Sequence, residues 1–116
     1  MPSIRETFRI EGNAPVTVLF TIGDAQIGGF STFHNGAKIA PVSVDETKAR
    51  YVLGAGSAVR FTDVSTQAFV KDVSKLTDHT SLSVAITQGN RTSTYSMEKV
   101  APTDGTVDYS IALWFE

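Results

Sequence analysis

The stretch TSLSVAITQGNRT, residues 80–92, decides the fold. Its apolar residues Leu82, Val84 and Ile86 are each separated by one small or hydroxyl-bearing residue. A period of two places successive side chains on opposite faces of an extended strand, so that one face is apolar and the other polar. Gly89-Asn90 follows, and a glycine in the first of two loop positions fits the type II′ turn of a tight hairpin. The stretch therefore predicts a half-buried strand that turns back into a second strand.

The same period of two recurs along the chain. Two further segments, PVTVLFTIG (15–23) and VDYSIALWFE (107–116), supply the other predicted core residues, which are Val16, Val18, Phe20, Ile22, Tyr109, Ile111, Leu113 and Phe115. Asn35-Gly36 tolerates positive φ and predicts a type I′ turn, and Pro102 with Asp104-Gly105 predicts a longer loop before the last strand. Strands are predicted at 4–11, 16–22, 27–34, 37–44, 49–53, 57–62, 66–73, 80–88, 91–99 and 106–116.

Two segments also allow a helical reading. Ser43 and Glu46 have the spacing of a capping box in front of residues 47–53. In residues 65–76, Phe69, Val73 and Leu76 recur at helical intervals. The β-branched content and the surrounding strands favour the extended alternative in both places.

Many short strands, frequent turn signals and the lack of a helical core predict an all-β protein of a single domain, residues 1–116. An antiparallel β-sandwich is favoured over a closed β-barrel, without a choice between jelly-roll and immunoglobulin-like topology. Pro41 and the GAGS segment, residues 54–57, interrupt the pattern and are predicted to be the places where the chain changes sheets.

Composition argues against several functions. The chain has 10 basic and 12 acidic residues without a charged run, so no nucleic-acid partner is expected. It has no cysteine and no apolar segment long enough for a membrane span. No signal peptide is recognisable at the start, so a cytoplasmic protein is the default expectation, and a secreted mature form stays open.

Candidate chemistry is sparse. His34 stands before the Asn-Gly turn, and His79 follows Asp78, but adjacent residues of an extended chain point in opposite directions. No residue is predicted to be catalytic or to bind a metal, and no cofactor is predicted. The sequence leaves open whether acidic residues gather around a cation. Those in predicted loops or at strand ends are Asp45, Glu46, Asp63, Asp72, Asp78 and Asp104.

The polar face of the strands is the most informative feature. Its hydroxyl-bearing residues are Ser81, Ser83, Thr87, Thr92, Thr94, Ser96 and Ser110, and the only tryptophan, Trp114, shares the phase of Ser110. The leading hypothesis is a non-enzymatic module that binds another protein or forms a homo-oligomer. The apolar last strand would promote such assembly if it lay at a sheet edge.

The alternative hypothesis is a small-ligand or glycan-binding module that uses this face. Its weak candidate ligand-binding residues are Trp114, Thr92, Thr94 and His34. An enzyme that assembles a site from loop histidines and carboxylates is the third and least favoured hypothesis.

Overall fold

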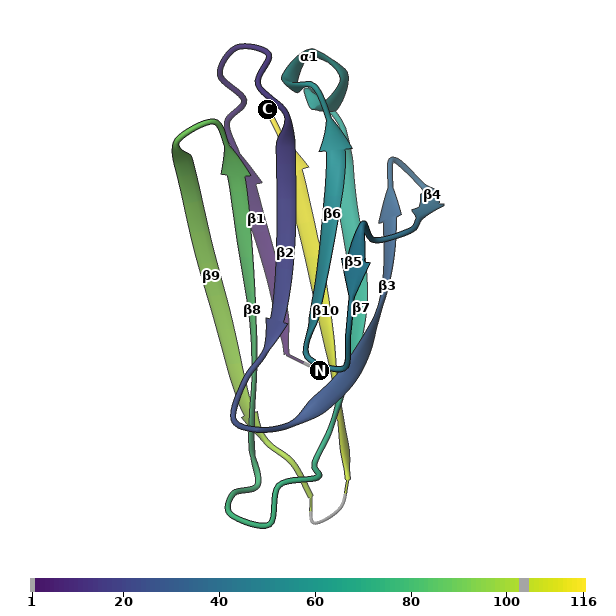
Figure 1. Ribbon diagram of the computed structural model, residues 1–116, viewed down its shortest axis with the longest axis vertical. Helices are drawn as coiled ribbons and strands as arrows, with labels where there is room; N and C mark the ends of the chain where they lie inside the picture. The colour runs from purple at the N-terminus through teal and green to yellow at the C-terminus, as the bar shows by residue number, and fades with distance from the viewer. Residues whose placement is uncertain (1, 103–104) are drawn as a thin grey trace.

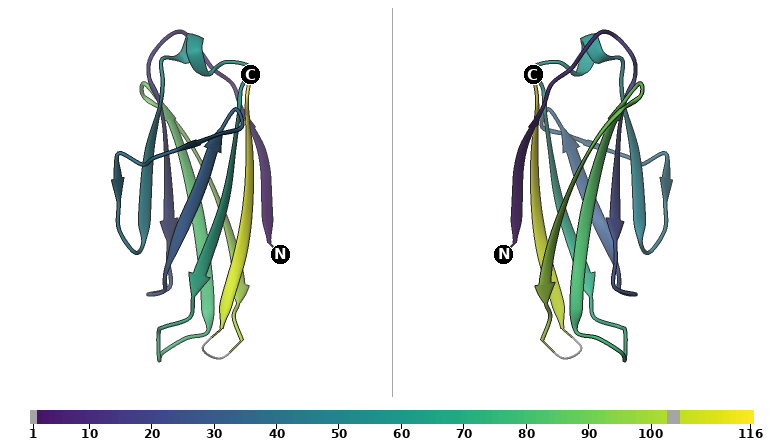
Figure 2. Two further views of the ribbon diagram at one scale, coloured as in Figure 1. Left: turned by 90° about the vertical axis from the view of Figure 1, so that its right-hand side faces the viewer. Right: turned by 90° about the vertical axis from the view of Figure 1, so that its left-hand side faces the viewer.

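The computed structural model describes residues 2–102 and 105–116 and consists of two β-sheets packed face to face (Figure 1). The strand order of the first sheet is β1 (Ser3–Phe8), β10 (Thr106–Phe115), β7 (Asp63–Lys71), β3 (Ile27–His34) and β4 (Ala37–Ile39). The strand order of the second sheet is β5 (Ser43–Val44), β6 (Lys48–Gly54), β2 (Val16–Ile22), β8 (His79–Gln88) and β9 (Arg91–Val100). A single turn of helix, α1 (Gly56–Val59), lies beyond one end of the strands (Figures 1 and 2). The β-sandwich prediction is confirmed, and the closed barrel is wrong because the described strands form two separate sheets.

The predicted core residues are buried between the two sheets. All eleven apolar residues assigned from the alternation, among them Val18, Phe20, Ile86 and Ile111, belong to the buried core. Phe20 contacts rings from both layers, with centroid distances of 5.8 Å to Phe30 and 5.9 Å to Tyr51. The period of two therefore identified correctly which side chains face inward.

The last strand is not an edge strand. β10 pairs antiparallel with β7 on one side, and the N-terminal strand β1 adds to its other side in parallel, with Ser3 opposite Ser110 and Phe8 opposite Phe115. The pair β1–β10 is the exception to the antiparallel pairing of the sandwich. Because β10 has a partner on both sides, it does not offer the free edge on which the assembly hypothesis relied.

Both predicted sheet changes occur. The segment predicted as one strand, 37–44, is divided between β4 in the first sheet and β5 in the second, and Pro41 lies in the crossing. Proline has no N–H to donate to a ladder, so β4 cannot continue through this position. The GAGS segment connects β6 of the second sheet with β7 of the first.

The strand predicted at 57–62 is wrong, because this segment forms α1 and a turn. A Cβ atom on Gly56 would lie 2.4 Å from the carbonyl oxygen of Gly12 and 2.6 Å from Nε2 of Gln88, so the chain passes close to remote backbone here. The backbone N–H of Ser57 donates to Oδ1 of Asn13 at 2.9 Å. These contacts come from residues more than thirty positions away in the sequence, and the local pattern did not contain them.

The two helical alternatives are not adopted. Residues 65–71 belong to β7, and the carboxylate of Asp45 accepts hydrogen bonds from the backbone N–H groups of Thr47 (2.7 Å) and Lys48 (2.9 Å). This Asx turn joins β5 to β6 in place of a helix start.

Both tight hairpins have the predicted turn signature. Asn35 and Gly36 have φ of 51° and 86°, as a type I′ turn requires. At the β8–β9 turn Gly89 has a φ of 60° and Asn90 has no positive φ, as in type II′. The loop predicted at 101–106 lies partly outside the described residues, which omit 103 and 104.

Gln26 organises the loop between β7 and β8. Its side chain is 1% exposed, and Oε1 accepts hydrogen bonds from the backbone N–H groups of Val73 (2.8 Å) and Ser74 (2.9 Å). Nε2 donates to Oδ1 of Asp72 (3.0 Å) and to the carbonyl oxygens of Thr77 and His79, both at 3.1 Å. One buried amide thus hydrogen-bonds with five polar groups in and at the end of a loop that lacks regular secondary structure, two of the three acceptors sharing one N–H of Nε2.

Replacement of Phe20 by alanine should lower the free energy of unfolding by about 3–5 kcal/mol, because it leaves a cavity between the sheets. Chemical denaturation measures this change. Phe69→Ala, at a ring that is 50% exposed, is the matched control and should cost well under half as much. Equal losses for the two variants would contradict the assignment of the inner face.

Gln26→Glu should destabilise the protein by about 3 kcal/mol at neutral pH, because it removes a donor and places a second carboxylate beside buried Asp72. The loss should shrink near pH 4, where protonation restores an O–H donor. Urea unfolding at both pH values measures it. The matched control is Gln67→Glu on the exposed face of β7, which should change stability by less than 1 kcal/mol. A loss for Gln26→Glu no larger than that of the control would contradict the role of this amide.

Candidate functional site

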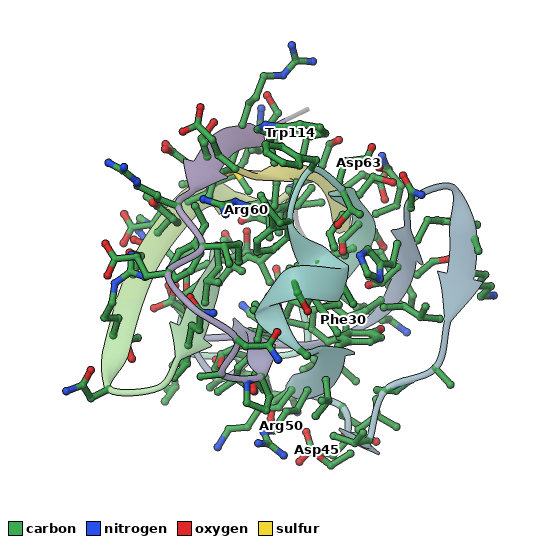
Figure 3. All side chains as sticks on the ribbon, turned by 90° about the horizontal axis from the view of Figure 1, so that it is seen from above. Phe30, Asp45, Arg50, Arg60, Asp63 and Trp114 are labelled. Carbon is green, nitrogen blue, oxygen red and sulfur yellow. The ribbon has the colours of Figure 1, made fainter. Side chains whose placement is uncertain are left out.

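The structure does not bring the sequence candidates together. Trp114 is 43% exposed on the outer face of the first sheet, whereas Thr92 and Thr94 are exposed on the outer face of β9 in the second sheet. Seen along the strands, Trp114 lies beside Asp63 on one side of the molecule, and Arg50 of the second sheet lies on the opposite side (Figure 3). A ligand stacked on Trp114 therefore cannot also contact the two threonines of β9.

His34 has a structural role in the β3–β4 hairpin. Its Nε2 lies 2.9 Å from the hydroxyl oxygen of Thr62, and that hydroxyl donates its single proton to the carbonyl oxygen of Val59. His34 must then donate through Nε2, which fixes the proton on this nitrogen. The bond ties the end of β3 to the turn after α1.

The two histidines lie at opposite ends of the sandwich. His34 ends β3, whereas the carbonyl oxygen of His79 accepts a bond from Gln26, which immediately precedes β3. Among residues 2–102 and 105–116, no group of three or more histidine and carboxylate side chains could hold a metal ion, and Asp104 lies outside this range. Nor does this part of the chain contain a helix with the length and apolarity to cross a membrane.

The outer face of the first sheet carries three aromatic side chains, which together we call the aromatic face: Trp114 on β10, Phe33 on β3 and Phe69 on β7. Strand register defines their positions. Trp114 lies between Thr7 of β1 and Asp63 of β7 in one row across the sheet, and Phe33 lies beside Ser65 in the next row. The spacing of strands and residues in a sheet places the backbones of Trp114 and Phe33 about 12 Å apart. It places the backbones of Phe33 and Phe69 about 14 Å apart.

Small and polar residues fill the space between the three rings. They share the outward phase of β10, β7 and β3 and are Ala112, Ser110, Ser65, Gln67 and Ser31. Nε2 of Gln67 donates to the hydroxyl of Ser110 at 3.1 Å, and both groups keep further hydrogen-bonding capacity. No large side chain of β10, β7 or β3 therefore stands between the rings.

Phe69 lies down on the sheet because its neighbour across the ladder is Gly29. A Cβ atom at residue 29 would lie 2.7 Å from Cε1 and 2.9 Å from Cζ of Phe69. The ring therefore occupies the space that any other side chain would need. One ring face contacts the strand backbone, and half of the side chain stays exposed.

Charged groups surround Trp114. A shallow depression of about 310 Å³ is lined by this residue together with Arg5, Glu6, Thr7 and Asp63, among others. Arg5, Glu6 and Asp63 form no ion pair or side-chain hydrogen bond with any described residue. Donors and acceptors therefore stand unengaged beside an exposed aromatic ring.

Sequence reasoning found Trp114 but missed Phe33, Phe69 and Arg5. It considered Asp63 only as one of the acidic residues that could gather around a cation. A signal for Phe69 was present, since it shares the phase of Asp63, Ser65, Gln67 and Lys71 and is the one large apolar residue among them. Phe69 also recurs with Val73 and Leu76 at the spacing of a helix, and this second pattern made the period of two harder to recognise. Phe33 has the outward phase of Ser31 on β3. Only the strand order shows that β3 and β7 share a sheet with β10.

The chain has no significant match to a family model, to a curated protein or to a solved structure. Function therefore has to be inferred from the geometry of these surfaces.

Proposed function

We propose that the protein is a non-enzymatic binding module whose aromatic face holds an extended oligosaccharide. The observation that carries this proposal is the placement of Trp114, Phe33 and Phe69 on one outer face of the sandwich with small polar residues between them. Sugar rings present apolar C–H faces that pack on aromatic rings, and their hydroxyl groups both donate and accept hydrogen bonds. The face offers both kinds of contact.

The spacing favours a chain over a single sugar. The backbones of neighbouring aromatic residues are separated by about 12–14 Å, which is more than the width of one sugar unit. A ligand that contacts two rings must then span several units, with its hydroxyl groups above Ser65, Gln67 and Ser110. The carboxylate of Asp63 and the guanidinium of Arg5 would hydrogen-bond a unit stacked on Trp114.

A protein partner fits this face less well. The centre of a protein interface is depleted in small polar residues and rich in well-packed apolar groups. Here the centre contains Ser65, Gln67 and Ser110. The exposed aliphatic residues lie outside this centre and are Val42, Val44, Val52, Val73, Leu76 and Val100. The composition between the rings therefore supports a hydroxyl-rich ligand.

Titration with a panel of soluble oligosaccharides should change the fluorescence of Trp114 for at least one glycan. Trp114→Ala and Phe69→Ala should each weaken binding about tenfold, the equivalent of about 1.4 kcal/mol of lost stacking, as calorimetry can measure. Thr94→Ala, on the other sheet, is the control and should leave the affinity unchanged. A folded protein that binds no glycan of the panel, or binds equally well without these rings, would contradict the proposal.

Self-association is the second candidate, and the edge of β9 favours it. Gln88 and Arg91 close the two-residue turn as a hydrogen-bonded pair, so the alternation of the ladder directs the backbone N–H and C=O groups of Thr92, Thr94 and Ser96 away from β8. Among the strands of the described residues, β9 pairs with β8 alone, and residues 92–97 contain neither a charge nor a proline. Such an unguarded edge can pair with the same strand of a second copy.

If β9 mediates assembly, the protein should sediment as a dimer at tens of micromolar concentration. Thr94→Pro should give a folded monomer, because it removes an outward N–H group and leaves the pairing with β8 intact. Thr94→Val keeps this N–H group and should remain dimeric. A wild-type monomer in sedimentation equilibrium would exclude this assembly.

A further inference from the structure

An apolar groove opens on the side of the sandwich where the chain crosses from β4 to β5. It has a volume of about 390 Å³, which is within the range of small-ligand sites. Phe30 and Tyr51 line it from the two sheets, and Ile39, Pro41 and Val44 line it from the crossing. None of the three rings of the aromatic face lines the groove, and Tyr51 and the inward-facing Phe30 belong to the core side of the sheets. Ser31 borders both surfaces.

The groove exists because β4 leaves β3 early. β4 pairs with β3 only through Ile39, and the next contact along this edge is the backbone N–H of Gly28, which donates to the carbonyl oxygen of Glu46 at 2.8 Å. Phe30 lies between these two points, and its position in the ladder directs its N–H and C=O to the same edge. The residue that would continue the register opposite Phe30 is Pro41, which has no N–H to offer.

Aromatic rings form the inner wall of the groove. Phe30 stacks on Phe20 with an interplanar angle of 29°, and Tyr51 meets Phe20 edge to face at 78°. The Tyr51 hydroxyl makes no hydrogen bond with any described residue, and no described side-chain polar atom is both unpaired and sealed from solvent. The hydroxyl therefore keeps a small accessible surface although Tyr51 is only 2% exposed, and Tyr51 lines this groove.

We infer that this groove binds a small aromatic molecule with one hydrogen-bonding substituent, such as a phenol or an indole. An aromatic ring would extend the cluster of Phe20, Phe30 and Tyr51 and take up the apolar volume. Its substituent would hydrogen-bond with the Tyr51 hydroxyl. Lys38 is the one charged residue that lines the groove, so a cationic ligand is disfavoured.

Phenol and indole are the probes, with binding followed by ligand-observed saturation-transfer NMR and by chemical shifts of the protein. Both should bind the wild type. Tyr51→Phe should weaken phenol about fivefold and leave toluene unaffected, because it removes one neutral hydrogen bond and keeps the ring.

A filling variant separates this site from unspecific binding. Ala40→Trp places an indole at the exposed mouth of the groove and should abolish binding of both probes. Val52→Trp adds the same group on the outer face of β6, outside the groove lining, and should have no effect. Absence of binding to the wild type, or binding that Ala40→Trp does not reduce, would overturn the inference. So would tighter binding of short tryptophan or tyrosine peptides than of the free probes, since the groove would then serve a polypeptide partner.

Discussion

The structure depends on the burial of every second side chain between two sheets. The strands are extended, so the side chains before and after a buried residue point outward. This holds for the neighbours of the core residues Val18, Phe20, Ile86 and Ile111. A slip of one residue would exchange the two faces completely, so the apolar contacts fix the register as well as the layers. What the protein can bind is thereby limited to the outward half of its residues, to the sheet edges and to places where the layers part.

The inward half could be predicted from the sequence, because it follows from local periodicity. The predicted core and both tight turns agree with the structure, as do the sheet changes at Pro41 and at residues 54–57. The error at 57–62 has a different origin. Contacts of Gly56 with Gly12 and Gln88 determine that segment, and interactions between such distant residues leave no periodic signal.

The candidate site was only partly predictable for a related reason. Alternation states whether a residue faces outward, but not which sheet carries its strand. Trp114 and Thr94 therefore seemed to share a surface, although they lie on opposite outer faces. Conversely, Phe33 and Phe69 join Trp114 only through the order β10–β7–β3, which places strands from distant parts of the sequence side by side.

One strained residue lies next to this surface and supports its assignment to binding. Phe61 has a φ of 63°, a conformation that costs a bulky side chain about 1–2 kcal/mol and that glycine would adopt without strain. Burial of the ring does not compensate this cost, since Phe61 is 67% exposed. The backbone N–H of Phe61 donates a hydrogen bond to the carbonyl oxygen of Phe115, but any residue except proline could donate it. Its ring contacts the guanidinium of Arg60, 5.5 Å from the ring centroid, and strain with so little packing in return is typical of residues at functional sites. Phe61 lies two positions before Asp63, which is the neighbour of Trp114 in the ladder. The strained backbone of Phe61 and the exposed tryptophan therefore lie at the same end of the same sheet.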